Sequence, residues 1–298
     1  MAETNGPALH SKREKLAAGL YLVATPIGNL GDITDRARAV MAAVDVIACE
    51  DTRMTRKLLG HYGLPAAGRL RRHDAHSRER DCRKLIEICL AGGSVALVSD
   101  AGAPLISDPG QELVRACAEA GVQVTTLPGA SAPIAALQLS GLPSVPFYFA
   151  GFLSAKAGER RQQIARLASI PATLLFFEAP HRVAACLADL AQGLGPREAA
   201  LVREITKRFE EVRRGDLQSL AAELAAAPVK GEIVLVVAPP EPRAVEIDDA
   251  ELTRLLEEAL QRLSLRDAVA QVAAVTDLPR RRVYRLALAT TADDAEKA

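Results

Sequence analysis

Short apolar runs alternate with amphipathic stretches from Leu20 onward, and this pattern predicts strands and helices that follow one another along the chain. In the first half the apolar runs cover 20–24, 44–49, 95–98 and 122–127, and helical periodicity occupies 34–44, 53–59, 77–90 and the stretch that begins at Pro109. Continuous apolar runs separated by helices are typical of strands buried on both faces of a parallel sheet. We therefore expect a parallel α/β domain here.

The second half contains the same kinds of segment in a less regular order. Strands are expected at 147–152, 173–177, 199–205, 209–213 and 233–237. Helices are expected at 159–168 and 216–226, and a further helix between them ends at Leu190. Because helices do not separate all of these strands, antiparallel pairing fits this half better. A proline-rich linker at 239–242 then leads to three short helices with a basic third helix, which resemble a helix-turn-helix bundle.

These patterns predict four segments. They are a flexible tail over 1–16, an α/β domain over 17–143, a second α/β domain over 144–240, and a linker with a helical appendix over 241–298. The boundary between the α/β domains is placed in the glycine- and proline-rich stretch before Phe147. The second domain is compositionally distinct, since six of the ten aromatic residues lie between Phe147 and Phe177.

Composition narrows the class of protein. The 298 residues are 49% hydrophobic and 25% charged, a mixture expected of a soluble globular protein and not of a disordered or fibrous one. No apolar run approaches the roughly 20 residues of a membrane helix, and the polar start lacks the apolar stretch of a signal peptide. Five cysteines without C-x-x-C spacing indicate no metal centre and favour the reducing cytoplasm. Thirty-seven basic and 37 acidic residues cancel, so any nucleic-acid surface must be local.

Three loops at expected strand ends, 25–31, 99–110 and 128–131, are rich in glycine, proline and small polar residues. Ligands of open α/β sheets collect beyond the carboxyl ends of strands. The charges of the central loop are the carboxylates Asp100 and Asp108, which disfavour a phosphate and favour a cationic or hydroxyl-rich ligand. Ordinary turns remain an equal alternative. The sequence contains neither the dinucleotide-binding motif nor the P-loop motif. The segment 129–133 reads GASAP and differs from the nucleophile-elbow motif G-x-S-x-G at its last residue.

Four ordered segments are more specific than any of these features alone: LVATPIGNL at 22–30, EDTR at 50–53, SDAGAPLISDPG at 99–110 and FEAPHR at 177–182. Together they resemble the signatures of the ribosomal small-subunit methyltransferase I family, a branch of the tetrapyrrole-methylase superfamily. The resemblance extends from about residue 19 to residue 288 and includes the helical appendix.

The resemblance implies a two-domain α/β protein with a helical appendix, in which S-adenosylmethionine binds between the α/β domains. It also implies a homodimer that does not associate with a membrane. The implied reaction methylates the ribose 2′-hydroxyl of a decoding-region cytidine in the 16S rRNA of the small ribosomal subunit. One position departs from the family pattern, since Ala103 stands where threonine is usual. The alanine removes one potential hydrogen bond to the cofactor. Corrin and sirohaem relatives usually carry aspartate there, so its absence favours the ribosomal branch.

The resemblance also implies the site residues, with no metal among them. The cofactor would be lined by Pro26, Asp100, Gly102, Ala103, Ile106, Ser131, Ala132 and Phe177. Core packing is the alternative for Ile106 and Phe177. A hydroxyl that accepts a methyl group must lose its proton, and Asp100 is the first candidate base, with His181 as the second. Asp100 can instead cap its loop or hold the cofactor, and His181 can cap a helix.

Basic residues give candidate contacts to RNA phosphate. Arg53 and Lys57 lie in an expected helix after the second strand, and Arg280, Arg281 and Arg282 lie in the last one. A solvated charged face is the alternative for each group. The segment 203–207 resembles another family signature, for which an ion pair between the domains is favoured over an RNA contact.

Two other functions stay open at this stage. A methyltransferase could act on a tetrapyrrole or another small molecule, although such an enzyme has no need for an arginine-rich helical appendix. A non-catalytic regulator could combine a helix-turn-helix module with a ligand-sensing core, although the loop motifs of the core speak against it.

Overall fold

The structure is a computed structural model that describes residues 16–74, 79–241, 248–276 and 278–297. The chain divides into two compact units, Met1–Pro240 and Glu241–Ala298, and each is described by itself. Within the described residues, no helix is both long and apolar enough to cross a membrane.

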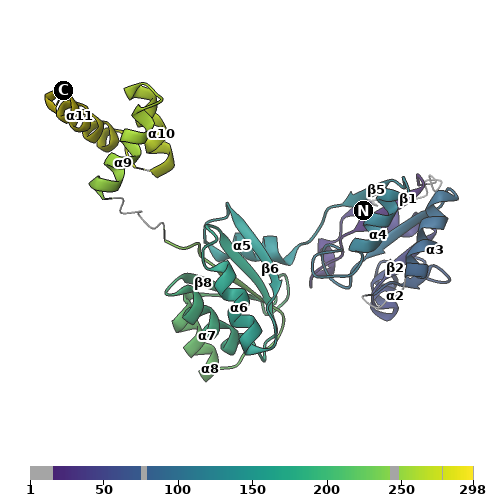
Figure 1. Ribbon diagram of the computed structural model, residues 1–298. Helices are drawn as coiled ribbons and strands as arrows, with labels where there is room; N and C mark the ends of the chain where they lie inside the picture. The colour runs from purple at the N-terminus through teal and green to yellow at the C-terminus, as the bar shows by residue number, and fades with distance from the viewer. Residues whose placement is uncertain (1–15, 75–78, 242–247, 277, 298) are drawn as a thin grey trace, which may run out of the picture. The chain divides into compact units, whose positions relative to one another are not determined.

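The first unit begins with a five-stranded parallel sheet in the order β3-β2-β4-β1-β5 (Figure 1). Its strands are β1 (Gly19–Val23), β2 (Val46–Cys49), β3 (Leu70–Arg72), β4 (Ser94–Val98) and β5 (Val124–Leu127). The parallel arrangement and four of the strands confirm the prediction. The short strand β3 was not predicted, because this edge strand reads LRR and two of its three side chains are exposed.

Helices cover both faces of this first sheet. They are α1 (Asp35–Ala43), α2 (Thr52–His61), α3 (Glu79–Leu90) and α4 (Gln111–Glu119), with a short 3-10 helix at Leu30–Asp32. The hydroxyl of Thr34 accepts a hydrogen bond from the N–H of Ala37 at 3.1 Å and caps α1. Helices α1 and α2 bury Met41 and Leu59 against one face, while α3 and α4 bury Leu85 and Leu113 against the other.

The second sheet of the same unit has the order β6-β7-β10-β8-β9. Its strands are β6 (Phe147–Phe152), β7 (Thr173–Glu178), β8 (Glu198–Arg203), β9 (Glu211–Asp216) and β10 (Ile233–Val237). The predicted antiparallel pairing is confirmed for β7-β10, β10-β8 and β8-β9, whereas β6 and β7 pair in parallel. Helix α6 (Ala157–Leu167) forms the crossover that a parallel pair requires.

The two faces of this second sheet are covered by different helices. Helices α6, α7 (Val183–Leu194) and α8 (Leu217–Ala226) pack on the face that carries Leu174, Phe176 and Leu235. Helix α5 (Ala132–Ser140) packs on the opposite face, which carries Leu175 and Val234. Helix α5 precedes the loop at which the sequence placed the domain boundary, yet it covers the second sheet. Its apolar side chains lie all around the helix, so its sequence has no amphipathic signal.

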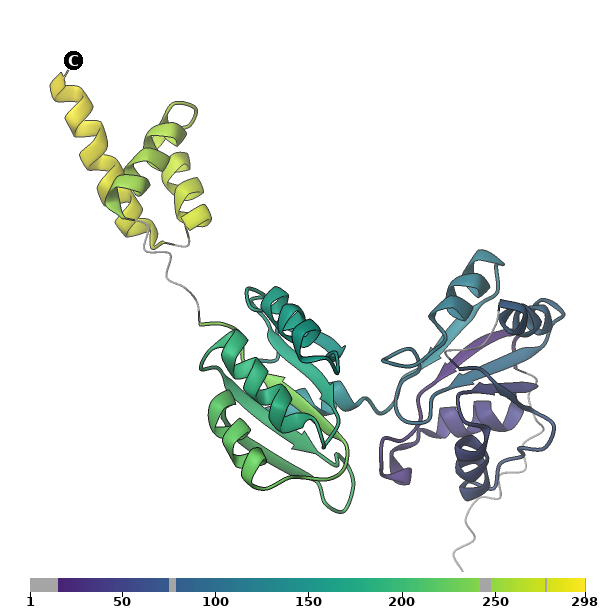
Figure 2. The ribbon, with the colours of Figure 1, turned by 60° about the horizontal axis from the view of Figure 1, so that its bottom comes forward.

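The second unit is a bundle of α9 (Asp249–Leu260), α10 (Leu265–Thr276) and α11 (Arg280–Lys297), drawn in green to yellow in Figure 2. Its core contains Leu252, Leu256, Val269, Val272 and Val283. The carboxylate of Asp248 accepts from the N–H of Glu251 at 2.7 Å and caps α9. The helix-turn-helix-like appendix is therefore present.

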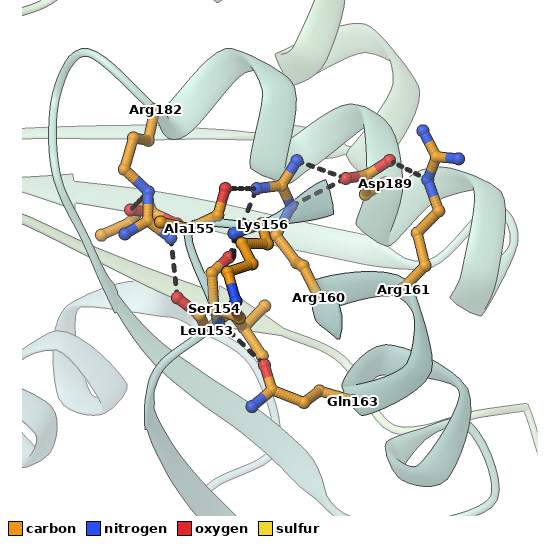
Figure 3. Close-up of polar contacts among 10 residues, drawn as sticks. Leu153, Ser154, Ala155, Lys156, Arg160, Arg161, Gln163, Arg182 and Asp189 are labelled. Atoms are coloured by element: carbon orange, nitrogen blue, oxygen red, sulfur yellow. Dashed lines mark hydrogen bonds and ion pairs between the residues drawn. The ribbon is translucent and has the colours of Figure 1, made fainter. Parts of the chain in front are cut away.

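A buried ion pair joins α6 to α7 (Figure 3). Arg160 and Asp189 are each 6% exposed, and Nε of Arg160 lies 2.7 Å from Oδ2 of Asp189. Oδ1 of Asp189 accepts from Nε of Arg161 at 2.9 Å. Burial raises the pKa of Asp189, but hydrogen bonds from Arg161 and Arg160 outweigh it and hold that pKa below its ordinary value. The carboxylate therefore stays ionised inside the protein.

We expect Asp189→Ala to lower the free energy of unfolding by about 3–5 kcal/mol, because it leaves the buried guanidinium of Arg160 without its partner. The control is Arg161→Ala, whose side chain is 60% exposed. It should cost about 1 kcal/mol or less. Urea titrations followed by circular dichroism measure both values. Equal losses in the two variants would contradict the account.

Candidate active site

Two loops cross at the carboxyl edge of the first sheet and hold each other through their backbones. The N–H of Thr25 donates to the carbonyl of Gly102 at 2.9 Å, and the N–H of Gly102 donates back at 3.1 Å. The buried hydroxyl of Thr25 donates to the carbonyl of Ser99 at 3.1 Å. The hydroxyl of Ser99 donates to the carbonyl of Gly102 at 3.0 Å. The loop after β1 therefore fixes the start of the loop after β4.

The loop after β4 has an unusual backbone. Positive φ angles occur at Gly102 (83°), Leu105 (74°), Ser107 (67°) and Gly110 (124°). The two residues with side chains cost about 1–3 kcal/mol each in this conformation. Such strain persists only where the surroundings impose it, and it concentrates at binding and catalytic sites. The loop is therefore shaped for a ligand at the expense of local stability.

Beside this loop lies a cavity of about 440 Å³, within the size range of small-molecule sites. The first half contributes loop and helix-start residues, namely Ile27, Ala101, Gly102, Ala103, Ile106, Ser107, Asp108, Ser131, Ala132 and Pro133. The second half contributes Phe152, Phe177, Glu178, Ala179, Pro180, Ile205, Gly231, Glu232, Ile233 and Val234. Residues from both sheets thus meet at one site.

Aromatic rings form one wall of the cavity. The rings of Phe152 and Phe177 lie 5.4 Å apart, and Phe149 meets Phe177 edge-on at 4.9 Å. The chain behind Phe152 is held by polar contacts drawn in Figure 3. Arg182 donates to the carbonyl of Leu153 at 2.7 Å, and the N–H of Ser154 donates to the side chain of Gln163 at 2.8 Å. The chain that directly follows Phe152 is therefore held in place by side chains of α6 and of the turn before α7.

Two of the three carboxylates that line the cavity have cationic partners. Glu178 is buried, accepts from the N–H of Ala179 at 2.8 Å, and pairs with Arg182 at 3.1 Å. Glu232 pairs with Lys207 at 3.0 Å. The third carboxylate, Asp108, has no ion pair within the described residues.

The half-buried position of Asp108 changes its acidity. Burial raises the pKa of Asp108 to about 6; the hydroxyl of Ser99 opposes the rise, and the negative charges of Glu50 and Asp100 add to it. A carboxyl group with this environment binds a proton more tightly than an exposed aspartate.

Six of the eight predicted cofactor residues line the cavity: Gly102, Ala103, Ile106, Ser131, Ala132 and Phe177. The other two, Pro26 and Asp100, are outside the lining. Ser131 occupies the N-cap position of α5 without a capping hydrogen bond from its side chain, so its hydroxyl is available to a ligand. Their contacts with a cofactor stay predictions.

The two predicted bases lie elsewhere on the surface. Asp100 is exposed, and its Oδ1 accepts from the N–H of Asp51 at 3.3 Å. His181 is exposed in the turn before α7, outside the cavity lining, although its neighbours Ala179 and Pro180 belong to it. The catalytic roles of Asp100 and His181 stay predictions.

Sequence reasoning missed several lining residues. Ile27 and Ile205 lie inside segments that resemble family signatures, so the sequence offered a reason to consider them. Phe152 and the stretch 231–234 lie outside those segments, and no sequence feature marked them as lining residues. Asp108 was noted as a charge of its loop and was not assigned a role. What distinguishes it is burial and the lack of a cationic partner, which only the folded structure shows.

The segment 203–207 joins the two halves in a way the sequence did not predict. The hydroxyl of Thr206 accepts from the N–H of Asn29 at 3.1 Å. A Cβ on Gly28 would lie 2.5 Å from Cγ of Lys207, so only glycine leaves room for that side chain. Lys207 pairs with Glu204 and Glu232 at 3.0 Å each. The predicted ion pair between the domains is wrong, because its partners lie in the same half.

The predicted RNA contacts are on exposed helices. Arg53 and Lys57 lie on α2, where Arg53 pairs with Asp51 at 2.9 Å. Arg280, Arg281 and Arg282 lie on α11, where Arg282 pairs with Asp249 at 2.9 Å. Exposed basic side chains can reach RNA phosphate, and the RNA-binding roles of these five residues stay predictions.

Comparison with known proteins identifies the family. Residues 19–221 match the model described as Tetrapyrrole (Corrin/Porphyrin) Methylases, and residues 246–291 match the RsmI C-terminal HTH domain. A ribosomal RNA small subunit methyltransferase I from Mesorhizobium japonicum is 47% identical over 272 residues, which cover 91% of each chain. The protein of the same name from Erythrobacter litoralis is 50% identical over 275 residues, which cover 92% of this chain and 96% of that one. The chain belongs to the ribosomal RNA small subunit methyltransferase I family.

Solved structures support the fold at lower identity. Diphthine synthase superposes with a TM-score of 0.57 at 19% identity, over 74% of this chain and 89% of that one. A uroporphyrin-III C-methyltransferase from Thermus thermophilus complexed with S-adenosyl homocysteine gives a TM-score of 0.53 at 20% identity, over 74% of this chain and 97% of that one. The tetrapyrrole-methylase fold with a helical C-terminal unit is therefore established.

Family membership makes the chain an S-adenosylmethionine-dependent methyltransferase. The donor supplies an electrophilic methyl group on a positively charged sulfur, and it carries no phosphate. The cavity fits such a molecule, since the described lining offers main-chain groups of 101–103, the hydroxyl of Ser131, and apolar walls at Ile106 and Phe177. Apolar walls also keep water away from the methyl group.

We expect Gly102→Ala to weaken the binding of S-adenosylhomocysteine roughly tenfold, which corresponds to about 1.4 kcal/mol. A Cβ there would meet Cγ2 of Ile27 at 3.2 Å and adopt a strained φ of 83°, so the floor of the cavity would shift. The control is Gly92→Ala, with a φ of 86° and no neighbour within 4 Å. It should lose similar stability and keep its affinity. Calorimetry measures both, and an unchanged affinity in Gly102→Ala would refute the role of this loop.

Proposed function

We propose that this chain methylates the ribose 2′-hydroxyl of a decoding-region cytidine in the 16S rRNA of the small ribosomal subunit. The observation that carries the proposal is the length of the similarity. Relatives named as ribosomal RNA small subunit methyltransferases align over about nine-tenths of both chains, and the C-terminal helical unit is included. Small-molecule methylases of the same fold cover only about three-quarters of this chain.

The reaction needs three things from the protein: alignment of the acceptor oxygen with the methyl group, exclusion of water, and removal of the hydroxyl proton. The strained loop 102–110 and the aromatic wall of Phe152 and Phe177 support the first two, because both are rigidly held. A ribose hydroxyl is a weak nucleophile until its proton has a place to go.

Contacts with the RNA backbone are assigned to exposed cations. Arg280 and Arg281 on α11 have no ion pair within the described residues, so they are available to phosphate. Lys57 on α2 is exposed in the same way, and Arg53 and Arg282 add charge beside these positions although each pairs with a carboxylate. Because phosphate contacts release counterions, binding to the subunit should weaken steeply as salt rises.

We also infer a homodimer that works in the cytoplasm. Exposed apolar side chains lie on the edge strand β6 and two residues before it: Val145, Phe147 and Tyr148 are 83%, 43% and 44% exposed. Exposed apolar residues on a sheet edge favour association. The five cysteines are buried and free of disulfides, which suits a reducing compartment.

Methyl transfer to unmodified small subunits tests the activity. With a labelled donor, the label should enter one decoding-region cytidine and block alkaline cleavage at that nucleotide, because cleavage needs a free 2′-hydroxyl. Nuclease mapping and mass spectrometry locate it. Label on a base, on protein or on a porphyrin offered in parallel would contradict the proposal.

Replacing Arg280 and Arg281 by alanine should reduce the slope of log affinity against log salt for the subunit by about one per lost phosphate contact. Donor affinity should not change. The control is Arg254→Ala, since Arg254 is occupied by Glu251 and Glu258 at 2.6 Å each. Filter binding at several salt concentrations measures the slopes. Identical slopes for the double variant and the control would rule out phosphate contact by this helix.

A further inference from the structure

Asp108 is distinguished from every other titratable side chain that lines the cavity. The described lining contains no histidine, lysine, cysteine or tyrosine, and its carboxylates are Asp108, Glu178 and Glu232. Glu178 is engaged by Arg182 and Glu232 by Lys207. A carboxylate locked in an ion pair is a poor proton acceptor. Asp108 is therefore the lining group with a free capacity to accept a proton.

Asp108 also lines a second, side cavity of about 270 Å³. The side cavity is lined by His73, Asp74, Cys82, Asp108, Pro109, Gly110, Gln111 and Glu112. A narrower gap lined by Glu50, His73, Ser99 and Asp108 lies next to it. One carboxylate thus borders both the reaction cavity and a separate polar space.

His73 at this side cavity has an unsatisfied atom. It follows strand β3, is 4% exposed, and its Nδ1 has no hydrogen-bond partner within the described residues. Burial lowers the pKa of His73, with the carboxylates of Asp74, Asp81 and Glu112 opposing, so the ring is neutral at pH 7. A buried polar atom without a partner costs about 1–3 kcal/mol. His73 and Asp108 line the same side cavity, and a neutral imidazole can receive a proton at one nitrogen and release it from the other.

We propose that Asp108 is the general base of the methyl transfer and that the side cavity, through His73, carries the proton to solvent. The proposal rests on the proposed function, because the group that loses the proton is a ribose hydroxyl. As its O–H bond breaks, the proton moves to a carboxylate oxygen of Asp108. The electron pair of that bond forms the new bond from oxygen to the methyl carbon. The carbon–sulfur bond breaks with its pair retained by sulfur, which leaves S-adenosylhomocysteine.

The surrounding charges suit this role. Glu50 after β2, Asp100 after β4, and Asp74 and Glu112 around the side cavity are negative, and no cation pairs with Asp108 within the described residues. Burial, with the charges of Glu50 and Asp100, raises the pKa of Asp108, so its carboxylate accepts a proton more readily than an exposed one while remaining ionised at pH 7. The methylation rate should therefore fall as the pH drops through about 6.

The first test is Asp108→Asn, which keeps the size of the side chain and removes its basicity. Single-turnover methylation of small subunits should slow by about 100-fold or more. The affinity for S-adenosylhomocysteine should stay within about threefold. The matched control is Glu119→Gln, an exposed carboxylate at the far end of α4, which should keep the wild-type rate. An Asp108→Asn enzyme of wild-type rate overturns the proposal, as does an equal loss in rate and donor affinity.

Asp100→Asn is the comparison within the same loop. Because Asp100 is exposed and outside the cavity lining, its loss should slow the reaction far less than the loss of Asp108. The reverse order would overturn the assignment and return the base to Asp100.

A second readout does not depend on activity. Carbon-13 NMR of aspartate-labelled protein should show one carboxyl that titrates near pH 6 and is absent from Asp108→Asn. If the wild-type enzyme labels an atom other than a ribose oxygen, the proposed function is wrong. The titration would still measure the acidity of Asp108, because it does not depend on which atom is methylated. A carboxyl of Asp108 that titrates below about 4, the ordinary range for aspartate, would refute the base.

The relay is tested with His73→Ala. The variant should be slower at pH 7, keep its donor affinity, and recover when imidazole is added, because the side cavity has room for the free ring. Asp108→Asn should not respond to imidazole. A His73→Ala enzyme that keeps the wild-type rate, or one that stays slow with imidazole, would remove His73 from the proton path.

Discussion

The site depends on the crossing of two loops at the carboxyl edge of the first sheet. Paired backbone hydrogen bonds join Thr25 to Gly102, and the buried hydroxyls of Thr25 and Ser99 complete the crossing. With its start fixed there, the loop after β4 must turn through several left-handed residues before α4 begins. That path brings small residues and main-chain groups to the cavity surface. It also places Asp108 between the reaction cavity and the side cavity.

The charge of the donor explains which charged side chains line the cavity. A sulfonium donor has no phosphate, so the protein needs neither a lysine cradle nor an open glycine-rich phosphate loop. It keeps negative groups instead, and engages those that must stay ionised with arginine or lysine. Burial raises the pKa of Asp108, the carboxylates of Glu50 and Asp100 add to the rise, and no cationic partner within the described residues opposes it. A group that holds and releases a proton near neutral pH suits acceptor chemistry better than one fixed in an ion pair.

The sequence predicted elements wherever one face or both faces of a segment were buried over several residues. Strand β3 was missed because its exposed side chains give no apolar run, and α5 was missed because it is apolar all around. Six of the residues predicted to contact the cofactor, taken from two loops and one strand, line the cavity, and their contacts with a cofactor stay predictions. The choice between Asp100 and Asp108 was beyond sequence reasoning, since both belong to one loop and differ only in burial. Asp108 shares a narrow gap with Glu50 after β2, His73 after β3 and Leu97 of β4, which are far apart in the chain.

We propose that a cationic, phosphate-free donor occupies the cavity where the two sheets of the first unit meet. A crystal structure of the protein soaked with S-adenosylhomocysteine tests this most directly. The account predicts ligand density against the main chain of 101–103, the hydroxyl of Ser131 and the ring of Phe177. Density at another surface, with this cavity closed or filled by solvent alone, would contradict it.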